Sequence, residues 1–214
     1  MKKYRAAIFD LDGVIVDTAK YHFLAWRKIA AELGLELTPD DNEKLKGVSR
    51  SQSFDIILAT GGMALSDAKK QAYLEQKNSL YVQYLQNMKQ DELLPGAVPL
   101  LQELQKRKIK TALGSASKNA SIVLEKLKIT SYFDGIVDGN SVAHSKPNSE
   151  VFVKAARQIN VDLRDCVVFE DSQAGIIAAK NAGMYAVGIG STVNLTGMDL
   201  LLSGLDQFDI NRLF

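Results

Sequence analysis

Short apolar runs alternate with amphipathic segments through most of this chain, and this alternation limits the fold more than any other feature. The apolar runs cover residues 4–9, 109–114, 135–138, 166–169 and 185–189. Segments with the apolar spacing of helices lie at 97–107, 119–127, 149–159 and 172–182. Strands that alternate with helices of this length are joined by right-handed crossovers. The pattern therefore predicts an α/β fold, in which a parallel sheet is covered by helices on both faces.

Residues 17–90 depart from this pattern because they contain helix signals and no strand signal. Helices are expected from Asp17 or Thr18 to Gly34, from Thr38-Pro39, from about Ser51 to Gly61-Gly62, and from about Ser66 to Met88. We therefore predict an inserted all-α cap domain at 17–90. Residues 1–16 and 91–214 would together form the α/β core domain.

Charge and hydrophobicity exclude several classes of partner. A formal net charge of +1 over 214 residues gives no basic field that would attract nucleic acid or an anionic membrane. The apolar run before Asp10 is too short for a signal peptide, and no segment could span a bilayer. We expect a cytoplasmic protein without nucleic-acid or membrane partners, and nothing requires more than a monomer. Cys166, the single cysteine, lies in an apolar run and is expected to be buried and inert.

Polar residues follow the predicted strands at the points where ligands bind in parallel α/β sheets. They are Asp10 and Asp12 after the first strand, Ser115 after the second, Lys146 downstream of the third, and Glu170 and Asp171 after the fourth. Because the carboxyl ends of parallel strands meet at one edge, segments far apart in the sequence would bring these side chains together.

This set of residue types suits phosphoryl transfer. Carboxylates such as Asp10 and Asp171 are ligands that Mg²⁺ prefers, and the ion would shield a carboxylate nucleophile from the incoming phosphate. Ser115 and Lys146 could hold phosphate oxygens, and Asp12 is placed to donate or accept a proton. Taken alone, each motif has an ordinary interpretation, as a solvated turn, a helix N-cap or a loop. Their order at four strand ends favours the catalytic hypothesis.

These motifs resemble the haloacid-dehalogenase superfamily over essentially the whole chain. The matching residues are Asp10-Leu11-Asp12-Gly13, Ser115, Lys146-Pro147 and Glu170-Asp171. Further stretches are similar to the β-phosphoglucomutases of that superfamily: Asp17 to His22, Trp26, Leu45 to Arg50, Lys77-Asn78, and Ser115 to Asn119. Val14 stands where Thr often follows Asp-Gly in the superfamily, and the mutases tolerate that residue. The resemblance implies a Rossmann-like core with a helical-bundle cap.

The resemblance also implies roles for individual residues. Asp10 would be the nucleophile that becomes an aspartyl phosphate. Asp12 would be the general acid/base, and its backbone carbonyl would join Asp10, Glu170 and Asp171 in binding one Mg²⁺ ion. Residues that contact phosphate or substrate would be His22, Trp26, Lys46, Gly47, Val48, Arg50, Ser53, Lys77, Ser115, Ala116, Ser117, Lys118, Asn119 and Lys146.

The activity implied by the resemblance is the interconversion of β-D-glucose 1-phosphate and glucose 6-phosphate, a phosphomutase reaction. Glucose 1,6-bisphosphate would be the activating phosphoryl donor to Asp10 and also the intermediate. Ser115 and Lys146 would hold the transferring phosphate. Arg50, Ser117 and Asn119 would bind the distal one. The partners would thus be small-molecule sugar phosphates.

Several residues have a competing structural interpretation when each is considered alone. His22 would then be a capping or packing residue, Trp26 part of the cap core, and Lys77 a solvated lysine on a polar helix. His144 is expected at the surface. For the chain after Gly190 we predict only that it completes the fold.

Two alternative functions use similar residues. The first is a sugar-phosphate or phosphoglycolate phosphatase on the same fold, in which water attacks the aspartyl phosphate. The second is a non-enzymatic phospho-accepting module of the response-regulator type. Such modules lack a helical insert after the first strand and lack an acid/base two residues past the phosphorylated aspartate, so the sequence disfavours them.

Overall fold

The computed structural model describes residues 3–45, 48–191 and 193–214, and within them it contains a six-stranded parallel sheet of order β3-β2-β1-β4-β5-β6. The strands are β1 (Ala6–Phe9), β2 (Lys110–Gly114), β3 (Gly135–Val137), β4 (Cys166–Glu170), β5 (Tyr185–Ile189) and β6 (Leu200–Leu202). The predicted α/β class is confirmed, as are the five predicted strands. Strand β6 was not predicted, because three leucines make a very short run, and the chain after Gly190 was expected only to complete the fold.

Strands β1 and β4 are apolar throughout because both of their faces are buried. In β1, Ala7 and Phe9 belong to one apolar cluster, whereas Ala6 and Ile8 belong to a second cluster on the opposite face. Cys166 in β4 is fully buried, as the sequence predicted. This alternation between two cores is typical of a parallel sheet covered on both sides.

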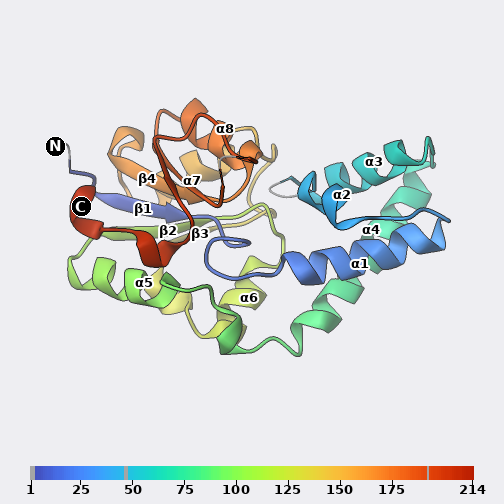
Figure 1. The fold of residues 1–214 in the computed structure, drawn as a ribbon, viewed down its shortest axis with the longest axis horizontal. Helices are drawn as coiled ribbons and strands as arrows, with labels where there is room; N and C mark the ends of the chain where they lie inside the picture. The colour runs from blue at the N-terminus through green and yellow to red at the C-terminus, as the bar shows by residue number, and fades with distance from the viewer. Residues whose placement is uncertain (1–2, 46–47, 192) are drawn as a thin grey trace.

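Four helices cover the sheet, two on each face (Figure 1). Helices α5 (Ala97–Lys106) and α6 (Ala120–Leu127) contribute to the cluster around Phe9. Helices α7 (Glu150–Gln158) and α8 (Gln173–Asn181) contribute to the cluster around Ile8. Short 3₁₀ turns lie at Gln90–Glu92, Thr130–Tyr132, Leu163–Asp165, Leu205–Gln207 and Ile210–Arg212.

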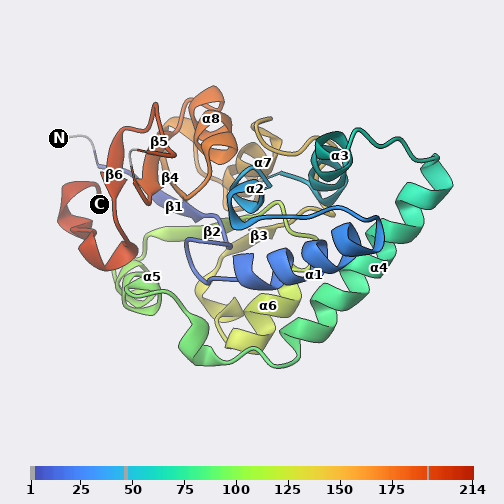
Figure 2. The same ribbon diagram turned by 45° about the vertical axis from the view of Figure 1, so that its right-hand side comes forward.

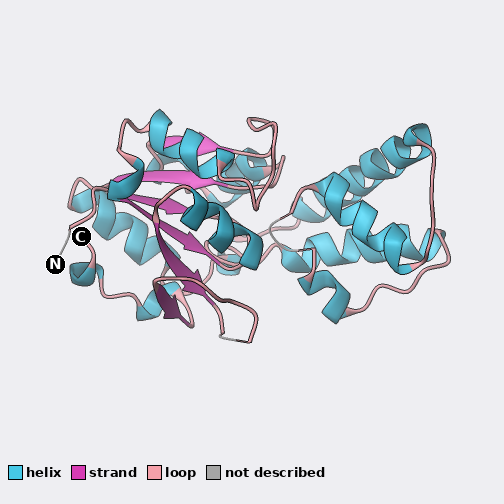
Figure 3. Ribbon diagram, turned by 90° about the horizontal axis from the view of Figure 1, so that it is seen from above, coloured by secondary structure: helices cyan, strands magenta, loops and turns pink. Residues whose placement is uncertain are grey.

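The segment between β1 and α5 is helical and lies beyond the carboxyl edge of the sheet (Figure 3). Its helices are α1 (Ala19–Glu32), α2 (Pro39–Glu43), α3 (Arg50–Thr60) and α4 (Asp67–Leu85). Thr38 caps α2, as expected from the sequence, and α4 begins near the predicted Ser66, which caps it. Helix α3 is capped by Ser49, two residues before the expected start, and α4 ends before Met88. Helices α1 and α4 pack side by side (Figure 2).

The helical segment has an apolar core of its own, formed around Trp26, Ile29 and Phe54. Its two connections to the sheet-bearing part meet, because Val16 and Leu93 form an antiparallel bridge and Leu94 donates its N–H to Ile15 O at 3.0 Å. We therefore keep 17–90 as the proposed extent of the cap. Among the described residues, no helix combines the length and apolar character needed to cross a membrane.

Candidate active site

Strands β1, β4 and β2 lie side by side and bring their terminal polar residues together. Asp10 directly follows β1, and its N–H donates to Phe169 O of β4 at 2.9 Å. Glu170 is the last residue of β4, and Ser115 follows β2 on the other side of β1. The convergence expected at the carboxyl edge is therefore present in the structure.

Three carboxylates gather at this edge with one ammonium group. Oxygens of Asp10, Glu170 and Asp171 all lie within 4.8 Å of one another. The Lys146 ammonium donates to Asp10 Oδ1 at 2.7 Å and to Glu170 Oε2 at 2.8 Å. One cation against three anions leaves excess negative charge, and all the ligand atoms are oxygen. The residues therefore fit a divalent cation of the Mg²⁺ type.

Burial controls the charge of Asp10 and its neighbours. The loss of hydration raises the pKa of Asp10 to about 7, although the Lys146 charge acts in the opposite direction and Glu170 adds to the increase. Burial also acts to lower the pKa of Lys146, but the two carboxylates that it contacts outweigh this effect and raise it. Lys146 thus stays cationic, and a bound divalent ion would favour ionised Asp10.

Two glycines allow these carboxylates to approach the backbone closely. A Cβ at Gly13, where φ is +76°, would collide with the Asp171 carboxylate. A Cβ at Gly175 would collide with the carboxylate of Glu170, which also accepts from Ser172 N and Ser172 Oγ at 3.0 and 2.6 Å. Glycine is therefore required at the fourth position of Asp10-Leu11-Asp12-Gly13, because any side chain there would collide with Asp171.

Asp12 lies two residues beyond Asp10 in a buried and electrostatically unfavourable position. Its Oδ1 is buried and has no hydrogen-bond partner among the described residues. Burial, with a further contribution from the Asp10 charge, raises the pKa of Asp12 to about 8. The carboxyl is therefore largely protonated at neutral pH and can act as a proton donor.

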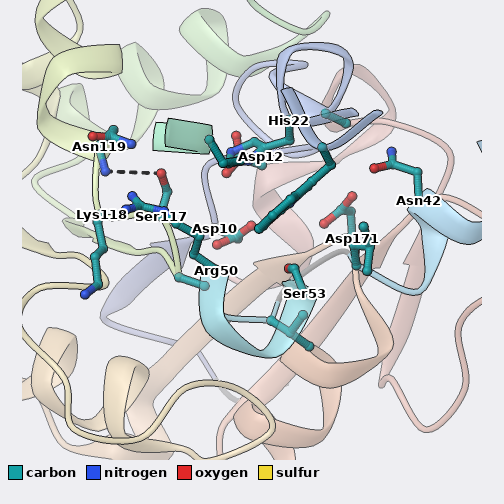
Figure 4. A pocket seen from close by; sticks show the side chains of 16 residues that line it. Asp10, Asp12, His22, Asn42, Arg50, Ser53, Ser117, Lys118, Asn119 and Asp171 are labelled. Atoms are coloured by element: carbon teal, nitrogen blue, oxygen red, sulfur yellow. Dashed lines mark hydrogen bonds between the residues drawn. The ribbon is translucent and has the colours of Figure 1, made fainter. Parts of the chain in front are cut away.

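A pocket opens above these residues, between the sheet edge and the helical segment. Figure 4 shows residues Ser117 to Asn119 on one side of it, and Asn42 and Asp171 on the other. The lining residues from the sheet-bearing part are Asp10, Asp12, Ala116, Ser117, Lys118, Asn119 and Asp171. Those from the helical segment are Ala19, His22, Trp26, Asn42, Leu45, Val48, Arg50, Ser53 and Lys77.

Lys77 is not the solvated surface lysine that a polar helix alone would predict. It is only 2% exposed, and its ammonium lies 2.6 Å from His22 Nδ1 and 4.9 Å from the centres of the Trp26 and Tyr81 rings. Burial, together with the Arg50 charge, lowers the pKa of Lys77 to about 7. Burial and the Lys77 charge likewise lower the pKa of His22, so its ring is neutral. His22 also lines the pocket, so it is not only a packing residue of the helical segment.

Trp26 in the cap and His144 outside the site occupy the positions expected from the sequence. Trp26 is 2% exposed and stacks on Phe54 with 5.6 Å between ring centres, and it also borders the pocket. His144 is exposed, as predicted. The predicted site residues Lys46 and Gly47 lie outside the described residues. Ser115, Lys146 and Glu170 are buried behind the pocket lining.

Comparison with known protein families agrees with this arrangement. The model of the haloacid dehalogenase-like hydrolase family matches residues 7–189. This chain belongs to that family. The match begins in β1, ends with β5 and therefore contains all the candidate site residues.

Relatives within the haloacid dehalogenase-like family include both mutases and phosphatases. The chain is 43% identical to the β-phosphoglucomutase of Bacillus subtilis, over 92% of this chain and 88% of the relative. It is 31% identical to the phosphorylated carbohydrates phosphatase of Thermotoga maritima, over 93% and 91% of the two chains. The crystal structure of β-phosphoglucomutase from Clostridium difficile superposes with a TM-score of 0.94 at 40% identity, covering 98% of this chain and 95% of that one.

Four residues near the pocket of this haloacid dehalogenase-like protein were not predicted as site residues. Ala19, Asn42 and Leu45 line the pocket. Asn78 accepts hydrogen bonds from Arg50 and Asn119 behind it. Ala19, Leu45 and Asn78 all lie within stretches already recognised as similar to the mutases, so membership of those stretches was an available signal. Nothing in the sequence near Asn42 pointed to the site.

Proposed function

We propose that this protein is a Mg²⁺-dependent phosphomutase that interconverts β-D-glucose 1-phosphate and glucose 6-phosphate. The reaction would pass through an aspartyl phosphate on Asp10 and a glucose 1,6-bisphosphate intermediate. One observation carries the proposal: cationic groups lie in two places at a single pocket, with Lys146 in contact with Asp10 behind the lining, and with Arg50 and Lys118 in the lining. A sugar bisphosphate needs two such regions. Similarity to the Bacillus subtilis β-phosphoglucomutase supports the sugar assignment.

In the proposed reaction, Asp10 and Asp12 divide covalent and proton transfer between them. An Asp10 oxygen would attack a phosphorus atom of the bisphosphate, the bond from phosphorus to the sugar oxygen would break, and Asp12 would donate its proton to that oxygen. The 6-hydroxyl of β-glucose 1-phosphate would then attack the phosphate on Asp10 while Asp12 accepts the hydroxyl proton. After the intermediate turns over, its 1-phosphate would return to Asp10 and glucose 6-phosphate would be released.

The remaining site residues would position the substrate and exclude water. Mg²⁺ held by Asp10, Asp12, Glu170 and Asp171 would neutralise the charge that otherwise repels the phosphate. Ser115 and Lys146 would hold the transferring phosphate. The residues that would contact the sugar and its other phosphate are His22, Trp26, Lys46, Gly47, Val48, Arg50, Ser53, Lys77, Ala116, Ser117, Lys118 and Asn119. Cap residues over Asp10 would favour a sugar hydroxyl over water as the acceptor.

A phosphatase is the alternative function, and the similarity to the Thermotoga maritima phosphatase favours keeping it. The protein should be incubated with β-glucose 1-phosphate, a trace of glucose 1,6-bisphosphate and Mg²⁺. We expect glucose 6-phosphate as the main product, because the pocket would hold the sugar at both ends. Free phosphate as the main product would support the phosphatase instead. A panel of other β-hexose 1-phosphates would then define the preferred sugar.

Removal of divalent cations should abolish turnover. We expect chelation with EDTA to stop glucose 6-phosphate formation and added Mg²⁺ to restore it, because three carboxylates within 4.8 Å need a cation before a phosphate can approach. The assay should be repeated with excess Ca²⁺ in place of Mg²⁺ as a control for specificity. Full activity in EDTA would contradict the proposed metal site.

Arg50→Ala should weaken the use of glucose 1,6-bisphosphate by about thirtyfold in kcat/KM, equivalent to roughly 2 kcal/mol of lost charge-assisted contact. Arg50 lines the pocket and is the cationic group of α3 that faces it. Arg157→Ala on the exposed side of α7 is the matched control, and it should behave like the unmodified protein. Unchanged kinetics in Arg50→Ala would remove Arg50 from the proposed site.

We further propose that the protein acts as a cytoplasmic monomer without nucleic-acid or membrane partners. The formal net charge of +1, which gives no basic field to attract nucleic acid or an anionic membrane, supports the absence of those partners.

A further inference from the structure

Asn78 joins the cap to the sheet-bearing part behind the pocket. Its Oδ1 accepts a hydrogen bond from Arg50 Nη2 at 2.7 Å and another from Asn119 Nδ2 at 2.8 Å. Asn78 lies in α4, Arg50 begins α3, and Asn119 precedes α6. The Asn78 amide oxygen therefore connects three segments, of which α3 and α4 belong to the cap and the start of α6 belongs to the sheet-bearing part.

Arg50 carries a charge that no carboxylate compensates within the described part of the chain. Among the described residues no side chain forms an ion pair with it, and Asn78 is the side chain that accepts a hydrogen bond from it. The guanidinium is half-buried, and burial lowers the pKa of Arg50 without removing its charge. A partly buried guanidinium whose hydrogen-bond partner is neutral keeps its full positive charge. It can therefore still bind an anion favourably.

The shared acceptor also determines how close the two donors lie. Because Arg50 Nη2 and Asn119 Nδ2 contact the same oxygen, they are separated by no more than two hydrogen-bond lengths. Both residues line the pocket, as do Ser117 and Lys118 between β2 and α6. Phosphate oxygens are bound in proteins by converging N–H and ammonium donors of this kind.

The residue type at position 78 is consistent with holding donors for an anion. A neutral amide oxygen can orient a guanidinium without cancelling its charge. A carboxylate in the same place would accept the same two hydrogen bonds, but it would neutralise Arg50 and repel phosphate.

We propose that Asn78 is a positioning residue, which ties Arg50 to Asn119 and thereby assembles the site for the second phosphate across the seam between cap and core. The inference rests on the proposed function, because it requires a ligand with two phosphates. Asn78 does not line the pocket, so it acts through Arg50 and Asn119. Binding of the second phosphate would thus depend on the cap being against the core.

The test is equilibrium binding of glucose 1,6-bisphosphate, measured by calorimetry in an Asp10→Asn background, where the ligand stays intact. When Asn78→Ala is introduced into the Asp10→Asn protein, binding should weaken by about tenfold or more, because Arg50 and Asn119 lose their common acceptor. Asn78→Asp in the same background should weaken binding at least as much, because the new carboxylate would repel phosphate. Its thermal unfolding midpoint should equal or exceed that of the Asp10→Asn protein, since both hydrogen bonds are kept. Ser79→Ala, on the exposed side of the same helix, is the matched control and should bind normally.

A double variant separates action through Arg50 from an independent effect. If Asn78 acts through Arg50, Arg50→Ala combined with Asn78→Ala should bind the bisphosphate only slightly more weakly than Arg50→Ala alone. Fully additive losses would contradict the inference. Normal binding by Asn78→Asp would show a purely structural role and would overturn it, as would normal binding by Asn78→Ala. Failure of the Asp10→Asn protein itself to bind the bisphosphate would instead reject the proposed function, and the inference with it.

Discussion

Asp10→Asn is expected to lower kcat by about 10⁴-fold or more, because it replaces the carboxylate that would carry the phosphate. An amide nitrogen or oxygen is a poor nucleophile toward phosphorus. Glu170 is held by Lys146 at 2.8 Å and by Ser172 at 2.6 Å, so it is committed to other contacts. Glucose 6-phosphate formation measures the loss directly.

The fold of Asp10→Asn should remain intact, since the amide oxygen can still accept the hydrogen bond from Lys146. Circular dichroism and the thermal unfolding midpoint check this. Asp40→Asn on the exposed surface of α2 is the matched control and should retain full activity. Turnover above one per cent of the unmodified rate, roughly the scale of a lost accessory group, would exclude covalent catalysis by Asp10.

Asp12→Ala should lower the rate of the mutase reaction by about 10²–10⁴-fold, the usual contribution of a general acid/base. A sugar oxygen is a poor leaving group without a proton. Asp12 can supply that proton at neutral pH, because burial raises its pKa to about 8. The need for a protonated Asp12 also predicts the direction of the pH dependence. Phosphorylation of Asp10 by glucose 1,6-bisphosphate should slow as the pH rises through about 8, where Asp12 loses its proton.

Acetyl phosphate separates proton transfer from covalent chemistry in the same variant. Acetate is a good leaving group that needs no proton, so Asp12→Ala should still become phosphorylated on Asp10 by acetyl phosphate. Asp12→Asn, which keeps the size of the side chain, should show the same selective loss. If both donors lost reactivity equally, Asp12 would be needed for the fold or the metal site, and the acid/base role would be rejected.

The sequence predicted the sheet and the edge where the polar residues gather, because those features depend on local patterns. Runs such as Cys166 to Phe169 are apolar on both faces, and polar residues that follow such strands must lie at the carboxyl edge. Lys146 was more difficult, since it lies in a loop well downstream of β3. It was placed at the carboxyl edge because it lies downstream of the third predicted strand, and the motif Lys146-Pro147 then matched the family.

The features that the sequence did not predict depend on tertiary contacts. The short strand β6 forms by pairing with β5, and a run of three leucines carries no periodic signal. Lys77 is buried because Tyr81 of its own helix and the distant His22 and Trp26 of α1 surround it, and the packing of α1 on α4 is a tertiary contact. The two hydrogen bonds that Asn78 accepts form only because the cap lies against the core and Asn119 approaches Arg50.

Detection of the phosphoenzyme is the most direct test of the proposed chemistry. The protein should be mixed with glucose 1,6-bisphosphate and Mg²⁺, quenched in acid at short times, digested, and analysed by mass spectrometry of the peptide that contains Asp10 and Asp12. We predict phosphate on Asp10, absent in Asp10→Asn, which disappears when β-glucose 1-phosphate is added and glucose 6-phosphate forms. An unmodified peptide throughout active turnover would contradict covalent catalysis by Asp10.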